Sequence, residues 1–585
     1  MAVENLITEH IDIWTSAVKT RSTSGRGSSK KLELYGIKKL RELILELAVR
    51  GKLVPQDSSD EPASVLLERI AQEKAQLVKE KKLKKPKKLP NIIDEEKPFD
   101  LPNGWSWIRL NEYGEWGSGS TPKRSNSGYY DGGIPWFKSG ELKADYISES
   151  EETITELALS ETSVRYNNVG DVLVAMYGAT IGKTAILSVR ATTNQAVCAC
   201  TPFTGLSNTY LLTLLKAYKA RLIGMGAGGA QPNISREKII NTVIALPSTA
   251  EQHRIVAKVD ELMALCDQLE QQTEASIEAH QVLVTTLLDT LTNSADADEL
   301  MQNWARISEH FDNLFTTEES IDQLKQTILQ LAVMGKLVPQ DPSDEPAAEL
   351  LKRIAEEKAQ LVKDKKIKKQ KALPPINEDE KPFELPNGWE WCRLEDVVDI
   401  QSGITKGRKL AGRELKTIPY LSVANVQRGY LILNNVKEID LPIDELEKYS
   451  VEDGDLLITE GGDWDKVGRT AIWRSEVPYM AHQNHVFKAR PFLKEQSEAW
   501  LEMYLNGPFA RKYFAGSSKQ TTNLASINKT QLRSCLIAVP PRDEKKEISD
   551  RVQELVGMCD LLLEGIRASL QTQLQLTDVI VDQVV

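Results

Sequence analysis

The chain has 585 residues, of which 41% are hydrophobic and 27% charged, and its formal net charge is −11 at pH 7. It contains no apolar run of about 18 residues, so the sequence predicts no membrane-spanning helix. The first residues lack the basic start and apolar core of a signal peptide, so we expect no secretory leader. The length suffices for about three or four domains.

The acidic charge is unevenly distributed along the chain. Residues 100–250 hold 13 basic and 13 acidic side chains, and residues 395–543 hold 20 of each. A neutral domain can still present a basic face, so composition leaves nucleic-acid binding open. The cysteines form no CxxC pair, which predicts reduced core thiols and a cytoplasmic protein. They are Cys198, Cys200, Cys266, Cys392, Cys535 and Cys559.

Residues 1–36 begin with a possible short helix and continue as RSTSGRGSSKK, a composition that predicts a flexible segment. A repeated block follows. Residues 40–110 align without a gap to residues 324–394 at an offset of 284, and 50 of the 71 positions are identical. A period near half the chain length indicates a two-fold duplication and excludes a solenoid.

Each repeated block has the spacing of two helices. Apolar residues from Leu40 to Ala48 recur at helical intervals. Asp60-Glu61-Pro62 predicts the start of a second helix, with Asp60 as its N-terminal cap and proline in the first turn. That helix runs into a lysine-rich stretch at residues 79–88, matched by residues 363–371. These stretches are either basic arms that touch DNA phosphates or solvated helix ends, and the two interpretations are compatible.

After Trp105 and Trp389 the pattern changes to short apolar runs separated by Gly, Pro and Ser turns. This pattern predicts two strand-rich mixed domains with some helices. The offset stays at 284 as far as Gly170/Gly454 and then grows to 293 at Pro247/Pro540. We therefore expect both mixed domains to share one fold, with small insertions in the second, although their sequences have diverged strongly.

A long helix is predicted after each mixed domain, at residues 250–293 and 544–585. Apolar or small residues recur in steps of four and three, from Ile255 to Leu287 and from Ile548 to Ile580, which indicates a heptad seam. The two seams superimpose at an offset of 293. Each helix is about 60 Å long at 1.5 Å per residue. Because a two-fold duplication relates the two helices, we expect them to pack antiparallel.

Two motifs suggest ligands that the rest of the sequence does not support. GATIGKT (178–184) resembles a P-loop, but Tyr177 occupies the first glycine position, and the second copy has a longer loop with Arg469 in place of Lys183. A basic residue after a glycine turn in both copies fits a DNA-facing loop better. His482 and His485 form HxxH without an acidic or Cys partner at ligand spacing, so we expect no metal site.

Basic and amide side chains near the turns of both mixed domains are candidates for DNA contact. Lys, Arg, Asn and Gln can read guanine and adenine edges, whereas an ordinary charged loop would have the same composition. The predicted DNA-binding residues are Lys123, Arg124, Lys138, Lys183 and Gln231 in the first domain and Lys406, Arg408, Lys409, Asn425, Gln427, Arg469 and Lys519 in the second. The sequence shows no methyltransferase, helicase or nuclease motif, so we predict no catalytic residue and no metal site.

The ordered set of motifs resembles the specificity subunit of type I DNA restriction–modification enzymes. The residues that carry the resemblance are LPNGWSWIRL and LPNGWEWCRL, GDVLVAMYGATIGKTAI and GDLLITEGGDWDKVGRTAIW, and IALPSTAEQHRIVAKVDEL and IAVPPRDEKKEISDRVQEL. The match covers almost the whole chain from about residue 36. It implies that each mixed domain is a target recognition domain that reads one half of a split DNA sequence, with the long helices setting the unread spacer.

The resemblance also implies partners. Two methylation subunits would use S-adenosylmethionine and flip out an adenine, and two restriction subunits would use ATP and Mg²⁺ to translocate and cleave DNA. This chain would bind double-stranded DNA and no cofactor of its own. Two alternatives stay open from sequence, namely a coiled-coil scaffold that binds only protein and a self-contained nuclease or methyltransferase.

The predicted fold class is mixed α/β (α+β), with two recognition domains separated by two long antiparallel coiled-coil helices and an internal pseudo-two-fold repeat. The predicted boundaries are 1–36 (flexible segment), 37–100 (helical repeat 1), 101–249 (recognition domain 1), 250–293 (long helix 1), 294–320 (linker), 321–384 (helical repeat 2), 385–543 (recognition domain 2) and 544–585 (long helix 2).

Overall fold

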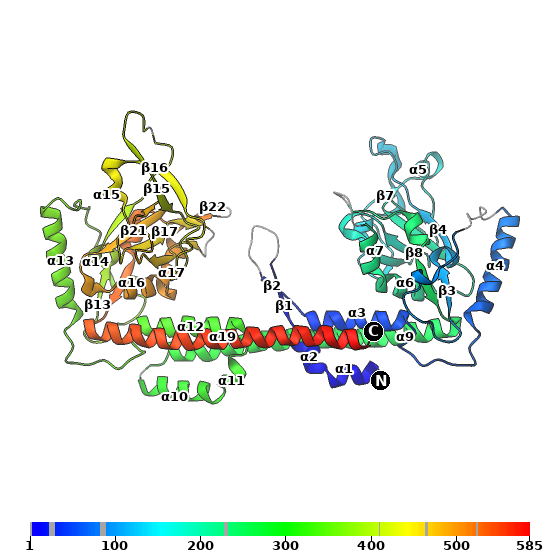
Figure 1. Cartoon of the computed structure of the whole chain (residues 1–585), viewed down its shortest axis with the longest axis horizontal. Helices are drawn as coiled ribbons and strands as arrows, with labels where there is room; N and C mark the ends of the chain where they lie inside the picture. The colour runs from blue at the N-terminus through cyan, green and yellow to red at the C-terminus, as the bar shows by residue number, and fades with distance from the viewer. Residues whose placement is uncertain are drawn as a thin grey trace. The chain divides into compact units, whose positions relative to one another are not determined.

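The computed structural model divides the chain into two compact units. Unit 1 is Met1–Ser276 with Ser569–Val585, and unit 2 is Ile277–Ala568 (Figure 1). Each unit contains one recognition domain and a part of each long helix, α9 (Thr249–Thr292) and α19 (Arg542–Val584). The structure describes residues 3–22, 30–81, 89–226, 232–295, 297–408, 410–462, 466–521 and 524–584.

The first helix of each repeated block packs against the long helices. In unit 1 this helix is α3 (Tyr35–Val49), and it buries Leu40, Leu43, Ile44 and Leu47. In unit 2 it is α12 (Glu318–Val333), which buries the equivalent residues Leu324, Thr327, Ile328 and Leu331. Their apolar faces follow the helical period read from the sequence. The second helices of the blocks are α4 (Ala63–Lys79) and α13 (Ala347–Lys363).

In unit 1, α3 runs antiparallel to α9 and parallel to α19. Arg41 contacts Glu270, whereas Gln56, further along the chain, contacts Glu251, nearer the start of α9. The contacts with α19 run the other way, from Tyr35 with Asp578 to Lys52 with Val584. The two long helices are therefore antiparallel within this unit.

Unit 2 gives the same result with the roles of the long helices exchanged. Glu318 contacts Arg567 and Lys325 contacts Asp560, so α12 is antiparallel to α19. On the α9 side, Glu319 contacts Gln281 and Gln323 contacts Thr285, so α12 is parallel to α9. The predicted antiparallel long helices and the internal two-fold repeat are confirmed.

The predicted heptad seam holds for the first half of α9 and then shifts by one residue. Leu283, predicted to face inward, is 50% exposed, whereas its neighbour Val284 is 1% exposed. In α19 the change is local, because Leu576 is 44% exposed and Thr577 is buried, whereas Ile580, a predicted seam residue, is 8% exposed. A straight α-helix drifts by about 20° per heptad relative to a 3.5-residue repeat, so a one-residue correction accumulates over a few heptads.

Recognition domain 1 consists of three small sheets with helices on their faces. The strand orders are β4-β11-β8-β9-β6, β10-β5-β7 and β12-β3. The strands are β3 (Ser106–Arg109), β4 (Gly114–Ser118), β5 (Tyr130–Phe137), β6 (Tyr146–Ile147), β7 (Thr153–Ile154), β8 (Val172–Ala175), β9 (Thr184–Leu187), β10 (Thr192–Thr193), β11 (Val197–Pro202) and β12 (Val243–Leu246). The helices are α5 (Glu156–Glu161), α6 (Asn208–Ala217), α7 (Lys219–Gly226) and α8 (Arg236–Ile240).

Recognition domain 2 repeats this topology. The strand orders β14-β21-β17-β19, β16-β15-β20 and β13-β24 correspond to those of domain 1, except that no strand among the described residues of domain 2 takes the place of β6. Domain 2 also contains the sheet β18-β23-β22. The strands are β13 (Glu390–Arg393), β14 (Val398–Ser402), β15 (Leu415–Leu421), β16 (Lys437–Pro442), β17 (Leu456–Thr459), β18 (Gly461–Gly462), β19 (Thr470–Ile472), β20 (Ala481–His482), β21 (Val486–Pro491), β22 (Lys519–Thr521), β23 (Leu524–Ser526) and β24 (Leu536–Val539). The helices are α14 (Leu394–Val397), α15 (Leu446–Tyr449), α16 (Glu498–Asn506), α17 (Pro508–Ser517) and α18 (Lys529–Ser534).

Two equivalent glycines show how closely the two domains correspond. A Cβ added at Gly119 would lie 2.2 Å from the carbonyl oxygen of Thr193, and one at Gly403 would lie 2.2 Å from that of His482. Thr193 and His482 occupy the same place in the parallel strand pairs β5/β10 and β15/β20. Only glycine permits this close backbone approach, which explains why both copies retain it.

The duplication also includes the start of the chain, for which the sequence predicts a flexible segment with a possible short helix. Helices α1 (Val3–Glu9) and α2 (Ile11–Ser16) correspond to α10 (Ala297–Glu309) and α11 (Phe311–Leu314), which lie in the predicted linker. His10 and His310 have nearly the same backbone angles between the paired helices. Each pair buries an apolar residue at the same distance beyond the histidine, Trp14 and Leu314.

A hairpin interrupts the first copy at one point. The offset is 300 at His10/His310 and 284 from α3 onward, so copy 1 contains 16 additional residues, 18–33. These residues include strands β1 (Lys19–Ser22) and β2 (Lys30–Glu33), which pair antiparallel. The Gly36 amide donates to the Ala17 carbonyl at 2.9 Å, so the chain ends on either side of the insertion meet. The hairpin is an insertion into a duplicated helical motif.

Candidate nucleic-acid interface

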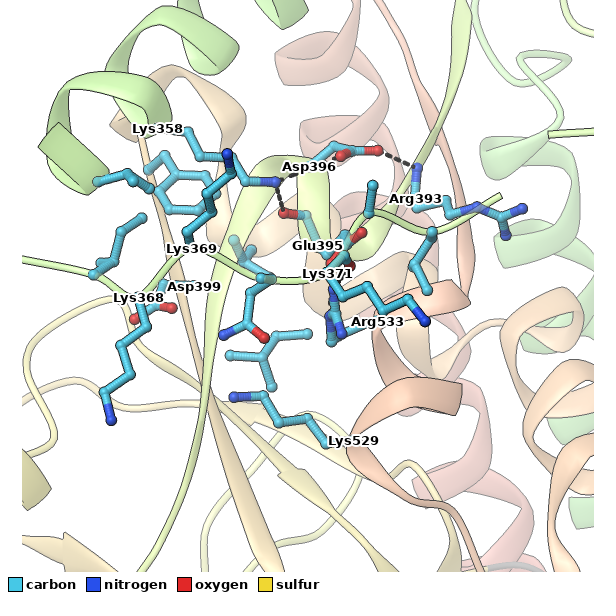
Figure 2. Close-up of a pocket in the computed structure, with 18 of the residues that line it drawn as sticks. Lys358, Lys368, Lys369, Lys371, Arg393, Glu395, Asp396, Asp399, Lys529 and Arg533 are labelled. Atoms are coloured by element: carbon cyan, nitrogen blue, oxygen red, sulfur yellow. Dashed lines mark hydrogen bonds and ion pairs between the residues drawn. The ribbon is translucent and has the colours of Figure 1, made fainter. Parts of the chain in front are cut away.

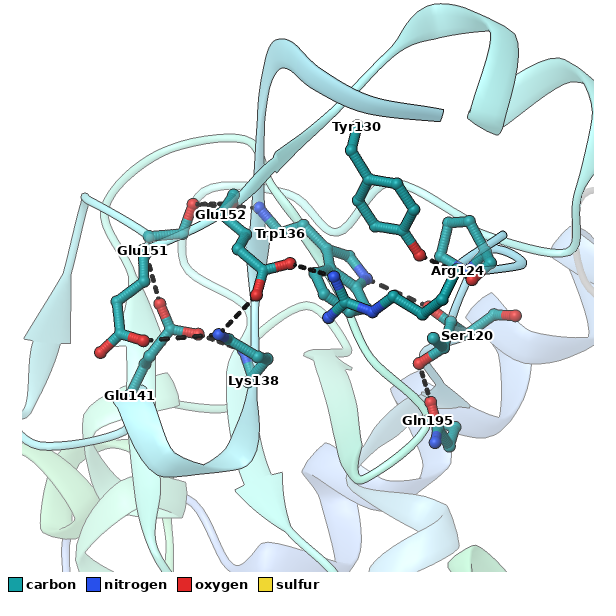
Figure 3. Close-up of polar contacts among 12 residues, drawn as sticks. Ser120, Arg124, Tyr130, Trp136, Lys138, Glu141, Glu151, Glu152 and Gln195 are labelled. Carbon is teal, nitrogen blue, oxygen red and sulfur yellow. Dashed lines mark hydrogen bonds and ion pairs between the residues drawn. The ribbon is translucent and has the colours of Figure 1, made fainter. Parts of the chain in front are cut away.

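In recognition domain 1, two predicted DNA-binding residues share one carboxylate (Figure 3). Nη1 of Arg124 lies 2.5 Å from Oε2 of Glu152, and Nζ of Lys138 lies 2.9 Å from Oε1. The two cations lower the pKa of Glu152, with the hydrogen bond from Arg124 as the largest cause. Lys138 also contacts Glu151 at 3.4 Å. Arg124 and Lys138 are therefore neutralised locally.

Aromatic rings hold the Arg124 guanidinium in place. Its Cζ lies 4.7 Å from the ring centroid of Tyr130 and 5.1 Å from that of Trp136 (Figure 3). The indole of Trp136 in turn donates to the Ser120 carbonyl at 3.1 Å. Such cation–π contacts orient an arginine whose side chain is still 55% exposed. Arg124 is thus positioned and accessible, with an acidic neighbour that a DNA phosphate would have to displace.

The other predicted residues of this domain are not part of that cluster. Lys123 is exposed and Lys183 is half-buried, and neither has an ion pair within the part of the chain that the structure describes. Gln231 lies outside the described residues. The GATIGKT stretch joins strands β8 and β9 through a short turn, with no helix after it. A P-loop leads from a strand into a helix, so this geometry excludes one.

Recognition domain 2 places an arginine and an aromatic ring in a similar way. Arg408, at the position equivalent to Arg124, forms a 2.7 Å ion pair with Glu445, which Arg413 shares at 2.6 Å. Nζ of Lys406 lies 5.0 Å from the ring centroid of Tyr420, which is equivalent to Trp136. Both domains therefore hold a cation over an aromatic ring, and the two rings lie on equivalent strands, β5 and β15.

Gln427 and Arg469, predicted separately, lie together. Nη1 of Arg469 donates to Oε1 of Gln427 at 2.6 Å, and Nε2 of Gln427 donates to the Ala424 carbonyl at 3.0 Å. Both side chains are half-buried. Their pairing fixes the orientation of the amide, so the two residues form one polar element on the surface of this domain.

The prediction that Asn425 reads a base needs a correction. It is 3% exposed, and its Oδ1 accepts from the amide and the hydroxyl of Ser422, while its Nδ2 donates to the Ile432 carbonyl. These contacts stabilise the loop between β15 and β16. The sequence suggested a base contact because Asn is a suitable residue type, but burial leaves none of its polar atoms available to DNA.

Two further candidates in this domain lie partly or wholly outside the described residues. Lys409 is not among the described residues, and only the backbone of Lys519, in β22, is described. The HxxH histidines take separate roles. His482 is buried, its Nδ1 lies 2.7 Å from the Val486 carbonyl, and burial lowers its pKa to about 4. His485 contacts Glu460.

Sequence reasoning missed the carboxylates that accompany the predicted cations. Glu152 and Glu445 lie 28 and 37 residues beyond the arginines that they bind, with no local pattern to connect them. Among the described residues, no group of three or more His, Cys, Asp or Glu side chains could hold a metal ion, and no helix is long and apolar enough to cross a membrane.

The comparison with protein families identifies the two mixed domains. The model of the type I restriction modification DNA specificity domain matches residues 102–279 and 386–572. The chain belongs to this family. The two matches coincide with the two topologically equivalent domains and extend into the long helices that follow them.

Curated relatives agree over the full length. The chain is 42% identical to the type I restriction enzyme EcoEI specificity subunit of Escherichia coli and 44% identical to the EcoAI specificity subunit of the same species. Each alignment covers 100% of this chain and 99% of the relative. The solved HsdS subunit from Thermoanaerobacter tengcongensis is 17% identical over 84% of this chain and 98% of that chain, with a TM-score of 0.39.

Family membership establishes the general function of the protein. It is the DNA specificity subunit of a type I restriction–modification system, a non-catalytic component of that complex. The recognition domains are accordingly the parts of the molecule in which DNA-contacting side chains must be sought.

Proposed function

We propose that recognition domains 1 and 2 each read one half of a split, asymmetric DNA sequence. The observation that carries this proposal is one topology used twice with different side chains at equivalent positions. Trp136 is replaced by Tyr420, and the site of Lys138 is occupied by Ser422. Two readers with the same fold and different side chains suit two different half-sites.

The residues proposed to contact DNA divide into two groups. Lys123, Lys138, Lys183 and Lys406 carry point charges suited to phosphates. Arg124, Arg408 and the Arg469–Gln427 pair are held by aromatic rings or hydrogen bonds and are suited to base edges. Gln231, Lys409 and Lys519 remain predictions from sequence, and Asn425 is not included because its polar atoms are used within its own loop.

We also propose that the repeated helical blocks bind two methylation subunits, and that two restriction subunits complete the complex. The two blocks are identical at 50 of 71 positions, whereas the recognition domains have diverged. Nearly identical blocks suit two copies of the same partner. S-adenosylmethionine, ATP and Mg²⁺ would act in those partners. The six free, buried cysteines support a cytoplasmic location.

Methylome sequencing of a host that carries this protein and its methylation partner tests the proposal. The expected result is one methylated motif with two half-sites separated by unread bases. Exchanging residues 101–249 for the equivalent domain of a relative should change one half-site and leave the other intact. A continuous motif, or a change in both halves, would contradict the split-site model.

A further inference from the structure

A pocket with an excess of positive charge lies at the edge of recognition domain 2, within unit 2. Its volume is about 390 Å³, and it lies between the lysine-rich connector at residues 367–376 and the domain itself (Figure 2). Strand β14, helix α14 and helix α18 provide the domain wall. Seven lysines and arginines line it, against three carboxylates, Glu395, Asp396 and Asp399.

Three of these cations are neutralised by the protein. Nζ of Lys358 donates to the Glu395 carbonyl at 2.7 Å and lies 3.5 Å from Asp396. Arg533 pairs with the Glu395 carboxylate, and its Nη2 donates to the Lys371 carbonyl at 2.8 Å, which ties the connector to the domain. Arg393 pairs with Glu380, which lies outside the pocket. The pocket is therefore built by fixed contacts.

Four lysines remain without a carboxylate partner. Among the described residues, no carboxylate oxygen lies within 4.0 Å of the Nζ atom of Lys368, Lys369, Lys371 or Lys529. Lys529 is half-buried, and burial is the largest cause that lowers its pKa, to which Arg533 and Lys368 add. Asp399 opposes this effect, but its carboxylate already accepts a 2.6 Å hydrogen bond from Gln401. A half-buried ammonium among other cations is stabilised by an added anion.

The helix of recognition domain 1 that is equivalent to α18 carries different side chains. Arg236 occupies the position of Lys529 and is exposed, and Ile240 occupies the position of Arg533. Helices α8 and α18 correspond, and the side chains at these two positions differ. The half-buried cation is thus specific to the second copy, and the first copy provides a matched control.

We propose that this pocket binds a phosphate group. Lysines act as mobile point charges toward phosphate, and four of them at one built pocket suit a ligand with more than one negative charge. Two sources have this chemistry, a backbone phosphate of the bound DNA and a small free phosphate. Binding of a DNA phosphate rests on the proposed function. In that case the connector would bind the DNA backbone beside recognition domain 2 whatever its sequence.

The first arm of the test uses small phosphates. Purified full-length protein is titrated with inorganic phosphate and with pyrophosphate, and binding is followed by calorimetry for the wild type, Lys529→Gln and Arg236→Gln. A free-phosphate site predicts binding that Lys529→Gln weakens by about tenfold, the loss expected for one charge-assisted contact, while Arg236→Gln leaves it unchanged. Thermal unfolding of each variant verifies the fold.

The second arm uses DNA and the complex with the methylation partner. A backbone-phosphate site predicts that Lys529→Gln weakens the binding of cognate and non-cognate DNA by the same factor. It also predicts that the slope of log affinity against log salt concentration becomes smaller by about 0.9. The methylated motif should stay the same, so failure of the split-site model would be visible independently in the methylome. The proposal is overturned if Lys529→Gln changes neither phosphate nor DNA binding, if Arg236→Gln has an equal effect, or if only partner assembly changes.

Discussion

The indole nitrogen of Trp105 donates a 2.9 Å hydrogen bond to the buried carboxylate of Glu251. Trp105 opens recognition domain 1, and Glu251 lies in the first turn of long helix α9, so this contact joins the domain to the helix. The second copy repeats it between Trp389 and Glu544, also at 2.9 Å. A carboxylate in the first turn of a helix is further stabilised by the helix dipole. Both copies thus fix the domain to the helix by the same contact.

Trp105→Phe should destabilise unit 1 by about 1–3 kcal/mol at neutral pH, because it leaves one side of a buried carboxylate without its donor. Burial already raises the pKa of Glu251, and the Trp105 hydrogen bond opposes this rise. Removing the bond raises the folded-state pKa further.

The sign of the pH dependence follows from this rise. A carboxyl group with a raised folded-state pKa destabilises the fold when ionised, so the loss in the variant is full above that pKa and shrinks as pH falls through it. Denaturant unfolding at pH 8 and pH 5 measures the difference. A loss that is larger at pH 5 would contradict this account, and Trp389→Phe should reproduce the result in unit 2.

Deleting residues 18–33, so that Ala17 is joined to Leu34, should leave the protein folded. The second copy has the same helical motif without the hairpin, and in the first copy Gly36 already bonds to Ala17. The expected cost is about 1 kcal/mol, from losing the contact of Lys19 with the Tyr35 ring and the exposed ion pair of Glu33 with Lys38.

Thermal unfolding measures this cost, and the control deletion removes residues 3–16. That deletion should destabilise unit 1 strongly because it removes Trp14 and Ile7, which are 0% and 1% exposed. If the hairpin deletion were the more damaging of the two, the hairpin would be part of the core motif and not an insertion.

Asn425→Ala should lower the free energy of unfolding of unit 2 by about 1–3 kcal/mol, because buried hydrogen-bonding groups of its loop lose their partner. The methylated motif should be unchanged in any variant population that folds. Gln427→Ala is the informative comparison, since Gln427 is half-buried and pairs with Arg469. A changed half-site with normal stability for Asn425→Ala would restore it as a base-reading residue.

Glu152→Gln should strengthen binding of non-cognate DNA by a few fold, because it frees Arg124 and Lys138 from their shared carboxylate. Its lowered pKa keeps Glu152 ionised throughout the neutral range, so the DNA affinity of the wild type should show no gain from protonation of Glu152 between pH 8 and pH 6. Affinity measured at fixed salt tests this. Glu149→Gln, the same charge change at an exposed site nearby, is the control and should have little effect.

Much of the architecture could be predicted because it depends on local periodicity and on internal repetition. The repeat at offset 284 predicted two equivalent domains, and residues such as Leu40 and Leu47 gave the helix faces that the structure buries. The prediction that Asp60 caps a helix was wrong. Its carboxylate binds Arg254 and Ser248, which are close only in the folded chain.

The sequence by itself determined the duplication, the order of the domains, the antiparallel long helices and the family, because these follow from patterns within one chain. Only the tertiary structure decided which polar side chains are available. It paired Arg124 with Glu152, buried Asn425 and left Lys529 half-buried with no carboxylate of the described residues in ion-pair contact. The physical reason is that burial and charge pairing join residues far apart in sequence, whereas residue type and spacing report only on neighbours along the chain.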